Sequence, residues 1–154
     1  MSGARVIVVV DDRQFQEALS NVESVLDGDG RELMLEDMGE YMLKSTRDHA
    51  ALEQDPQGHP WAPLSPRYAR RKAKKRPGAP ILVLDNHMLG DMLAYQVSKE
   101  VLYVGTAAIW GATHEFGRGG IPARPFLGVS ETDATELTQI VHDHIQAAIE
   151  GSRS

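Results

Sequence analysis

The feature that most constrains this fold is segment 110–128, WGATHEFGRGGIPARPFLG, in which glycines and prolines are interspersed with bulky apolar residues. The glycines within 117–120 accept positive φ at little cost. Pro122 and Pro125 fix φ and favour extended backbone in the residues that precede them. The composition therefore predicts a flexible turn that leads into a rigid extended segment, rather than a regular helix or a long strand.

Two interpretations of the extended part, 121–127, follow from its apolar end at Phe126 and Leu127. In the first, the segment is an ordered loop that Phe126 anchors within its own chain. In the second, it contacts a neighbouring subunit, because two prolines reduce the entropy lost when an extended segment docks. The second interpretation gives these candidate interface residues: Trp61, Trp110, Phe116, Ile121, Arg124, Phe126 and Leu127.

Length and composition limit the classes of protein that this chain can form. A chain of 154 residues with 42% apolar residues suits a single domain over 1–154 with one sizeable core. The absence of cysteine excludes disulfides, thiolate metal sites and a cysteine nucleophile. The run Val6–Val10 is too short to cross a bilayer, and the N-terminus lacks the order of a signal peptide. We expect a soluble, unexported protein without a membrane partner, ending in a flexible tail at 151–154.

Charge is unevenly distributed along the chain. The net charge is −6, yet the segment 67–76 contains no acidic residue. We call its basic residues the basic arm, within a connector at about 66–80; they are Arg67, Arg70, Arg71, Lys72, Lys74, Lys75 and Arg76. So many like charges cannot be buried without partners. We expect the basic arm to be poorly ordered or to face a partner, either a neighbouring subunit or the phosphates of a nucleic acid.

The first half of the chain predicts one strand and two helices before a proline-rich connector. The β-branched run that ends at Val10 predicts a covered strand, and residues 11–28 predict an amphipathic helix. A second helix is expected from Asp29 to about Gln54. Its apolar stripe comprises Met34, Leu35, Met38, Tyr41, Met42 and Leu52. We interpret the methionines as core residues rather than as a cofactor site.

The second half predicts shorter elements and one long helix. Ser65 and Pro66 begin a short basic helix, and Asp85 caps a brief helix covering Met88, Leu89, Met92 and Leu93. A hairpin is expected from segments 94–97 and 101–105, with Tyr95 contacting Tyr103 across the strands. Thr106 starts a short helix, and Ser130 with Asp133 opens a long helix that ends at Gly151. The fold class is α+β: a small, mainly antiparallel sheet with several helices on one face and long connecting loops.

No pattern in the chain predicts catalysis, a cofactor or a metal site. The glycines at 117–120 lack the lysine of a phosphate-binding loop and lead into a proline rather than a helix. His142 and His144 are two residues apart, whereas metal-binding pairs on a helix are three or four apart. Glu115 beside His114 lacks the nucleophile and second carboxylate of an active site. We therefore predict that the protein is not an enzyme.

Several of these segments resemble the virion morphogenesis family of Mu-like and related tailed phages. The resemblance covers most of the chain, and segment 121–128, IPARPFLG, is its most specific part. The other matching segments are the glycine, tryptophan and proline element at 58–65 with the basic run after it, 81–84 with Leu89, 104–105, and His114 with 116–117. The chain departs from the family pattern at Trp110 and Gly111, and at Asn86 and His87, which affects local packing.

The resemblance implies a structural virion protein that forms a ring at the junction of head and tail and is needed to join tails to DNA-filled heads. A hexamer is favoured, and a dodecamer is the alternative. The implied partners are other neck, connector and tail proteins, and the implied locations are the virion neck and, during assembly, the host cytoplasm. Two other hypotheses stay open, a packaging or assembly factor that contacts DNA through residues 67–76 and, more remotely, a small hydrolase.

Overall fold

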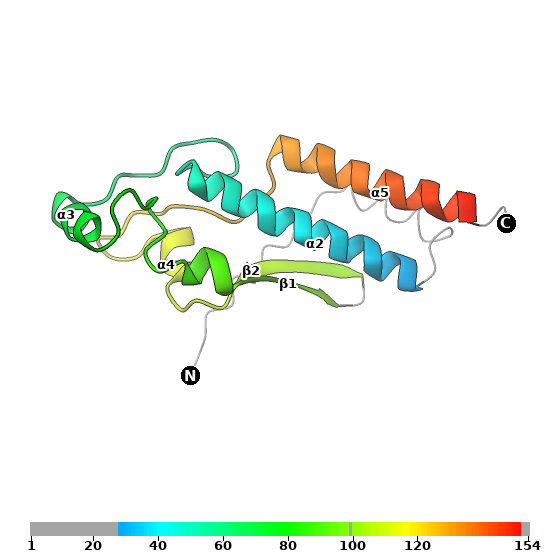
Figure 1. The fold of residues 1–154 in the computed structure, drawn as a ribbon, viewed down its shortest axis with the longest axis horizontal. Coiled ribbons are helices and arrows are strands. Elements are labelled where there is room, and N and C mark those ends of the chain that lie inside the picture. Colours follow the sequence, from blue (N-terminus) through cyan, green and yellow to red (C-terminus); the bar gives the residue numbers. More distant parts are fainter. Residues whose placement is uncertain (1–27, 99, 152–154) are drawn as a thin grey trace.

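The computed structural model describes residues 28–98 and 100–151, and its core is built around one long helix. Helix α2 (Gly28–Ala51) lies between helix α5 (Glu131–Gly151) on one side and the hairpin of β1 (Leu93–Ser98) and β2 (Val101–Thr106) on the other (Figure 1). Both long helices thus lie on the same face of the hairpin. The α+β prediction is confirmed; the strand expected at Val6–Val10 and the helix expected over 11–28 fall outside the described residues.

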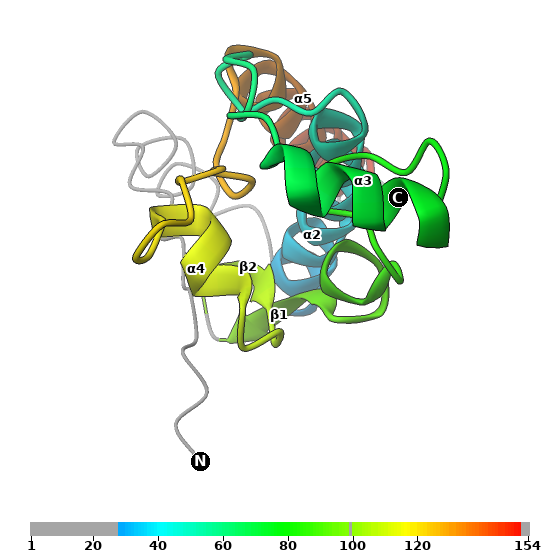
Figure 2. The same cartoon turned by 90° about the vertical axis from the view of Figure 1, so that its left-hand side faces the viewer.

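Three short helices gather toward the C-terminal end of α2. They are α3 (Pro66–Lys75), the π-helix η1 (His87–Asp91) and α4 (Gly111–Phe116). Helix α3 forms one extremity of the described molecule (Figure 1), and in the view from that side it lies nearest the viewer, with α4 beside it (Figure 2). The molecule is therefore elongated, with α3 at one end and the C-terminal part of α5 at the other.

Helix α2 supplies side chains to two adjoining apolar clusters. Met34, Leu35, Met38 and Met42 are buried against Leu137 and Val141 of α5, and recur at the three- and four-residue spacing of one helix face. Further along, Leu43 and Ala50 join a second cluster that includes Trp61, Met88, Leu89, Leu93, Ala108, Phe126 and Leu127. The methionines are core residues, as predicted. Leu52 is exposed, contrary to the prediction, because α2 ends at Ala51.

The hairpin has the predicted strands but not the predicted tyrosine pair. Tyr95 is opposite Val104, and Tyr103 is opposite Gln96. Neighbouring residues of a strand point to opposite faces, so the two tyrosines lie on different faces of the sheet and do not form a cross-strand pair. The Tyr95 ring packs on Gly39 of α2, where an added Cβ would lie 2.5 Å from the ring. A glycine at position 39 therefore allows the close approach of α2 and β1.

Two predicted helix starts are confirmed in atomic detail. Pro66 is the first residue of α3, and the Oγ of Ser65 accepts a hydrogen bond from the backbone N–H of Tyr68 at 3.4 Å. At the start of α5, the Ser130 N–H donates to Oδ2 of Asp133 at 2.8 Å, while the Asp133 N–H donates to Oγ of Ser130 at 3.0 Å. This reciprocal pair is a capping box, and it satisfies donors that a helix N-terminus leaves free.

Two other predicted starts are wrong. Asp85 does not cap η1; Asn86, at φ 56°, precedes that helix, and the Asp85 carboxylate faces the basic arm instead. Thr106 ends β2, and its hydroxyl donates to the carbonyl of Met88 at 3.0 Å. The short helix α4 begins only at Gly111, where an added Cβ would lie 2.5 Å from Cγ2 of Thr106. Asp85 and Thr106 therefore contact other parts of the fold instead of capping the helices predicted to begin at them.

Candidate functional site

The two proline-rich segments of the chain meet in a junction that joins residues about 60 positions apart. We call segments 60–64 and 121–128 together the proline junction. Nε1 of Trp61 donates to the carbonyl of Pro125 at 2.7 Å. The Arg124 guanidinium donates in return, through Nε to the carbonyl of Ala62 at 2.7 Å and through Nη2 to that of Pro63 at 2.9 Å. Each segment thus satisfies polar groups of the other.

Helix α4 holds the second segment of the junction from the opposite side. One carboxylate oxygen of Glu115 accepts hydrogen bonds from the backbone N–H groups of Phe126 and Leu127, at 2.9 and 3.2 Å. The Arg124 N–H donates to the carbonyl of His114 at 2.6 Å. Phe126 is 1% exposed and is the largest fully buried side chain among the described residues. Phe126 therefore anchors segment 121–127 within its own chain, as the first interpretation predicted.

The seven candidate interface residues fall into a buried and an exposed set. Trp61, Arg124, Phe126 and Leu127 are buried within the subunit. Their contacts are internal because the tryptophan and the guanidinium meet backbone carbonyls across the proline junction. Trp110, Phe116 and Ile121 are exposed, and Phe116 keeps 70% of its surface accessible. Of the seven candidates, only these exposed three are available to a partner in the folded subunit.

The exposed residues lie in the short helix α4 and in the turns directly before and after it. Sequence reasoning missed Ile109, which is 71% exposed. Ile109 and Trp110 form the turn that leads into α4, and Phe116 is the last residue of that helix. Paired backbone hydrogen bonds between Arg118 and Ile121, both 3.0 Å, close a turn directly after α4. We call Ile109, Trp110, Phe116 and Ile121 the α4 apolar surface. An apolar surface of this kind is typical of a protein contact.

The basic arm is a regular helix, and one of its cations is internal. Lys72 is 5% exposed and donates to the carbonyls of Pro80 and Ile81. Burial lowers the pKa of Lys72, and Glu53 acts in the opposite direction. Lys72 thus contradicts the prediction that the arm does not pack inside its own domain. The other six cations are exposed: Arg67, Arg70, Arg71, Lys74, Lys75 and Arg76.

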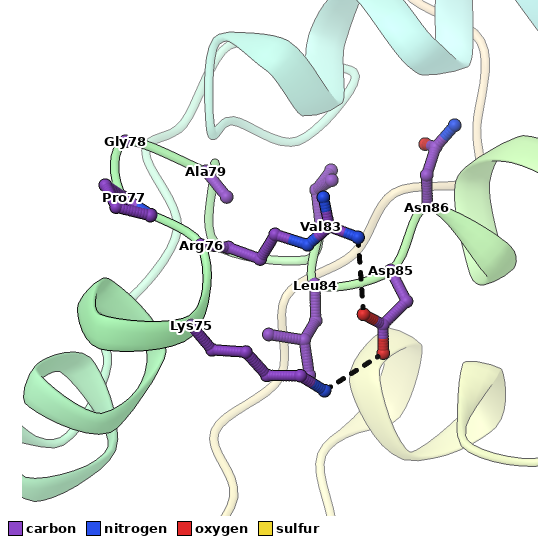
Figure 3. A pocket seen from close by; sticks show the side chains of 9 residues that line it. All are labelled: Lys75, Arg76, Pro77, Gly78, Ala79, Val83, Leu84, Asp85 and Asn86. Carbon is purple, nitrogen blue, oxygen red and sulfur yellow. Dashed lines mark ion pairs between the residues drawn. The ribbon is translucent and has the colours of Figure 1, made fainter.

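Three of the exposed cations have partners in the same subunit. The Arg71 guanidinium stacks over the Tyr68 ring, 5.2 Å from its centroid. Lys75 and Arg76 approach the two carboxylate oxygens of Asp85, at 3.5 and 3.7 Å, across an open pocket of about 500 Å³ (Figure 3). Both cations share the single Asp85 carboxylate, which neutralises part of the charge at this pocket. Arg67, Arg70 and Lys74 have no side-chain partner among residues 28–98 and 100–151.

The ionisable groups beside the junction do not form an acid–base pair. Burial raises the pKa of Glu115, and the backbone N–H groups of Phe126 and Leu127 only partly offset that effect. Burial lowers the pKa of His114, and the nearby Arg124 cation acts in the same direction. The Glu115 oxygen is occupied by backbone donors, which is a structural role. Within the described ranges no group of three or more histidine or carboxylate side chains is arranged to hold a metal ion.

Arg124→Met should destabilise the subunit by about 2 kcal/mol, because it leaves the carbonyls of Ala62 and Pro63 without their donor in a buried setting. Arg124→Lys should recover only part of that loss, because an ammonium group lacks the planar fork that reaches two carbonyls. Urea unfolding followed by circular dichroism measures both values. An unchanged midpoint for Arg124→Met would show that the two segments hold together without the guanidinium.

The sequence of this chain matches a known family of phage proteins. The phage virion morphogenesis family matches residues 10–146, and the chain belongs to this family. One relative is the Mu-like prophage FluMu G protein 1 of Haemophilus influenzae, strain Rd, which is 26% identical over 133 residues, covering 86% of this chain and 89% of the relative. The Mu-like prophage FluMu G protein 2 of the same strain is 33% identical over 90 residues, covering 54% and 64%. No solved structure matches the chain.

The chain is thus a phage virion morphogenesis protein similar to Mu-like G proteins, and the resemblance seen in its motifs is confirmed. Both segments of the proline junction lie within the matched range 10–146. The helices of the described part include none that is long and apolar enough to cross a membrane.

Proposed function

We propose that this protein is a structural subunit that forms a ring at the head–tail junction of a tailed phage and is needed to join tails to DNA-filled heads. It acts there without catalysis, and its partners are further copies of itself and other neck, connector and tail proteins. A hexamer fits the symmetry of a tail, and a dodecamer fits a ring that follows the portal. The protein would be part of the virion neck after assembly in the host cytoplasm.

The observation that carries this proposal is the α4 apolar surface. A folded subunit that exposes Ile109 in the turn before α4 and Phe116 at the end of α4, a helix held in place by the proline junction, has a rigid contact surface ready for a partner. A rigid surface loses little conformational entropy on docking. Family membership supplies the context, since virion morphogenesis proteins act during particle assembly.

Joining of heads to tails tests the proposal directly. A phage that lacks the gene should yield separate full heads and tails in lysates viewed by electron microscopy, and the intact gene on a plasmid should restore whole particles. Ile109→Asn combined with Phe116→Asn should fail to restore joining while the thermal midpoint of the purified protein stays within about 2 °C, because both side chains are exposed. Whole virions from the gene-deleted phage would refute the proposed function.

A DNA-contacting role in packaging or assembly is the second candidate. Arg67, Arg70 and Lys74 are exposed on one short helix and have no side-chain partner in the described part of the chain, which suits phosphate contacts. Such binding would weaken steeply as salt concentration rises. A gene-deleted phage that accumulates empty heads, rather than separate full heads and tails, would favour this candidate.

A further inference from the structure

Three cations of the basic arm, which have no side-chain partner among the described residues, form a stripe along α3. Arg67, Arg70 and Lys74 follow one another at intervals of three and four residues, so they share one helix face. Lys72 points into the subunit, while Lys75 and Arg76 face Asp85. The two ends of the stripe, seven residues apart, are separated by about 10.5 Å along the helix axis.

Helix α5 carries an acidic stripe with the same repeat. Glu136, Asp143 and Glu150 are exposed and spaced seven residues apart. Successive carboxylates are thus also about 10.5 Å apart along the axis. The helix contains neither lysine nor arginine, and its opposite face, with Leu137 and Val141, is buried against α2. Gln139 and Gln146 hydrogen-bond to Asp143 and Glu150, which holds both carboxylates on the outer face.

We propose, on the basis of the ring function above, that the α3 stripe of one subunit docks against the α5 stripe of a second copy. Within one subunit the stripes lie on different parts of the long axis, with α3 at one end and α5 running away from it (Figure 1). They therefore cannot neutralise each other internally. Two different surfaces that bind head to tail generate a closed ring when the rotation closes.

Charge and spacing make a second copy the occupant of the α3 stripe. The equal repeats place two cations over two carboxylates in a side-by-side crossing of the helices, and like-charge contacts in other registers are disfavoured. Exposed ion pairs contribute little affinity one at a time. The stripes therefore set the register and orientation of neighbours, and the α4 apolar surface is the complementary source of buried contact area.

Charge reversal in a complementation assay tests this pairing. In a phage that lacks the gene, Arg67→Glu/Arg70→Glu/Lys74→Glu and Glu136→Lys/Asp143→Lys/Glu150→Lys should each lower the infectious titre by about 100-fold or more, since several like-charge contacts arise at every interface. The six-residue variant should recover to within about tenfold of the unchanged protein, because opposite charges again meet. Asp91→Lys, which reverses an exposed carboxylate outside both stripes, is the matched control and should leave the titre unchanged.

The outcomes separate this pairing from the proposed function. Failure of the six-residue variant to recover, or full titre with the α5 reversal alone, would overturn the pairing even where the deletion still separates heads from tails. If the α3 reversal lowers the titre while the α5 reversal does not, α3 has another partner. A gene deletion that leaves heads joined to tails would instead refute the ring function itself.

An engineered cross-link gives an independent readout, because the chain contains no cysteine. Arg70→Cys/Asp143→Cys particles treated with a short bifunctional thiol reagent should yield a ladder of linked subunits in a denaturing gel. Arg70→Cys/Asp91→Cys particles, the control, should yield no ladder. A ladder in the control alone, or none in either, contradicts the proposed contact.

Discussion

Phe126→Ala is expected to destabilise the subunit strongly rather than merely to block assembly. The ring is 1% exposed and contacts a cluster drawn from α2, η1, β1 and the proline junction, so its removal leaves a cavity among several elements. Truncation of a buried phenylalanine costs about 3–5 kcal/mol. In a domain of this size that loss lowers the melting temperature by about 10 °C. Thermal unfolding followed by circular dichroism measures the shift.

Phe116→Ala is the matched control for this prediction. Phe116 is the same residue type, ten positions earlier, but 70% of its surface is exposed. Its truncation should change the free energy of unfolding by no more than about 0.5 kcal/mol. If Phe126→Ala instead melted at the unchanged temperature and failed only in head–tail joining, Phe126 would be an assembly residue after all.

The contrast between these phenylalanines shows where sequence reasoning reaches its limit. Both lie in the same glycine- and proline-rich segment, and their local sequence does not distinguish a core residue from an exposed one. Burial of Phe126 depends on Glu115, whose carboxylate binds the backbone N–H of residue 126, and on Trp61, which lies 65 positions earlier. Such long-range partners leave no periodic signal in one sequence.

Elements with local signals were predicted well. Ser65 and Pro66 mark the start of α3, the pair of Ser130 and Asp133 marks that of α5, and the hairpin strands follow from their apolar residues. The same local logic failed at Asp85 and Thr106. Asp85 forms ion pairs with Lys75 and Arg76, and Thr106 donates a hydrogen bond to the carbonyl of Met88, so neither side chain caps the helix that follows it.

The sequence of the basic arm predicts the exposure of most of its cations but not the burial of Lys72, for a physical reason. Its sequence gives the charge and the helix start, and mutual repulsion correctly implies that most of its cations stay in water. Lys72 is the exception, because two carbonyls at Pro80 and Ile81 accept its ammonium protons where the chain turns back on α3. In the folded subunit, Lys72 therefore binds backbone carbonyls, Lys75 and Arg76 face Asp85, and the remaining stripe, Arg67, Arg70 and Lys74, is exposed along α3.

Asp133→Ala is expected to be the second strongly destabilising change. The residue is 1% exposed, and its carboxylate accepts hydrogen bonds from Ser45 Oγ, from Tyr41 Oη at 2.9 Å and from the Ser130 N–H at 2.8 Å. Two of these donors lie on α2, so one side chain both caps α5 and fastens it to α2. Loss of the cap costs about 1 kcal/mol, and each buried donor left unpaired costs about 1–3 kcal/mol. The sum, about 4 kcal/mol, is measurable as a lower urea midpoint.

The same carboxylate makes stability depend on pH with a definite sign. Burial by itself would raise the pKa of Asp133, but hydrogen bonds from Ser45, Ser130 and Tyr41 outweigh burial and lower it below the ordinary value of 3.8. A depressed pKa in the folded state means that the stabilisation is fully present above the unfolded-state value and is lost as pH falls through the folded-state value. The hydrogen bond between Tyr41 and Asp133 also affects the tyrosine. Burial, together with this bond, raises the pKa of Tyr41 to about 12.

Unfolding free energies measured from pH 6 down to pH 2 in the intact protein and in Asp133→Asn test this assignment. The asparagine variant should be less stable at pH 6, because its neutral amide is a weaker acceptor for the three donors. It should also lose less stability on acidification, so the gap between the two proteins should narrow below the ordinary aspartate pKa of 3.8. A gap that stayed constant down to pH 2 would show that titration of Asp133 does not link stability to pH.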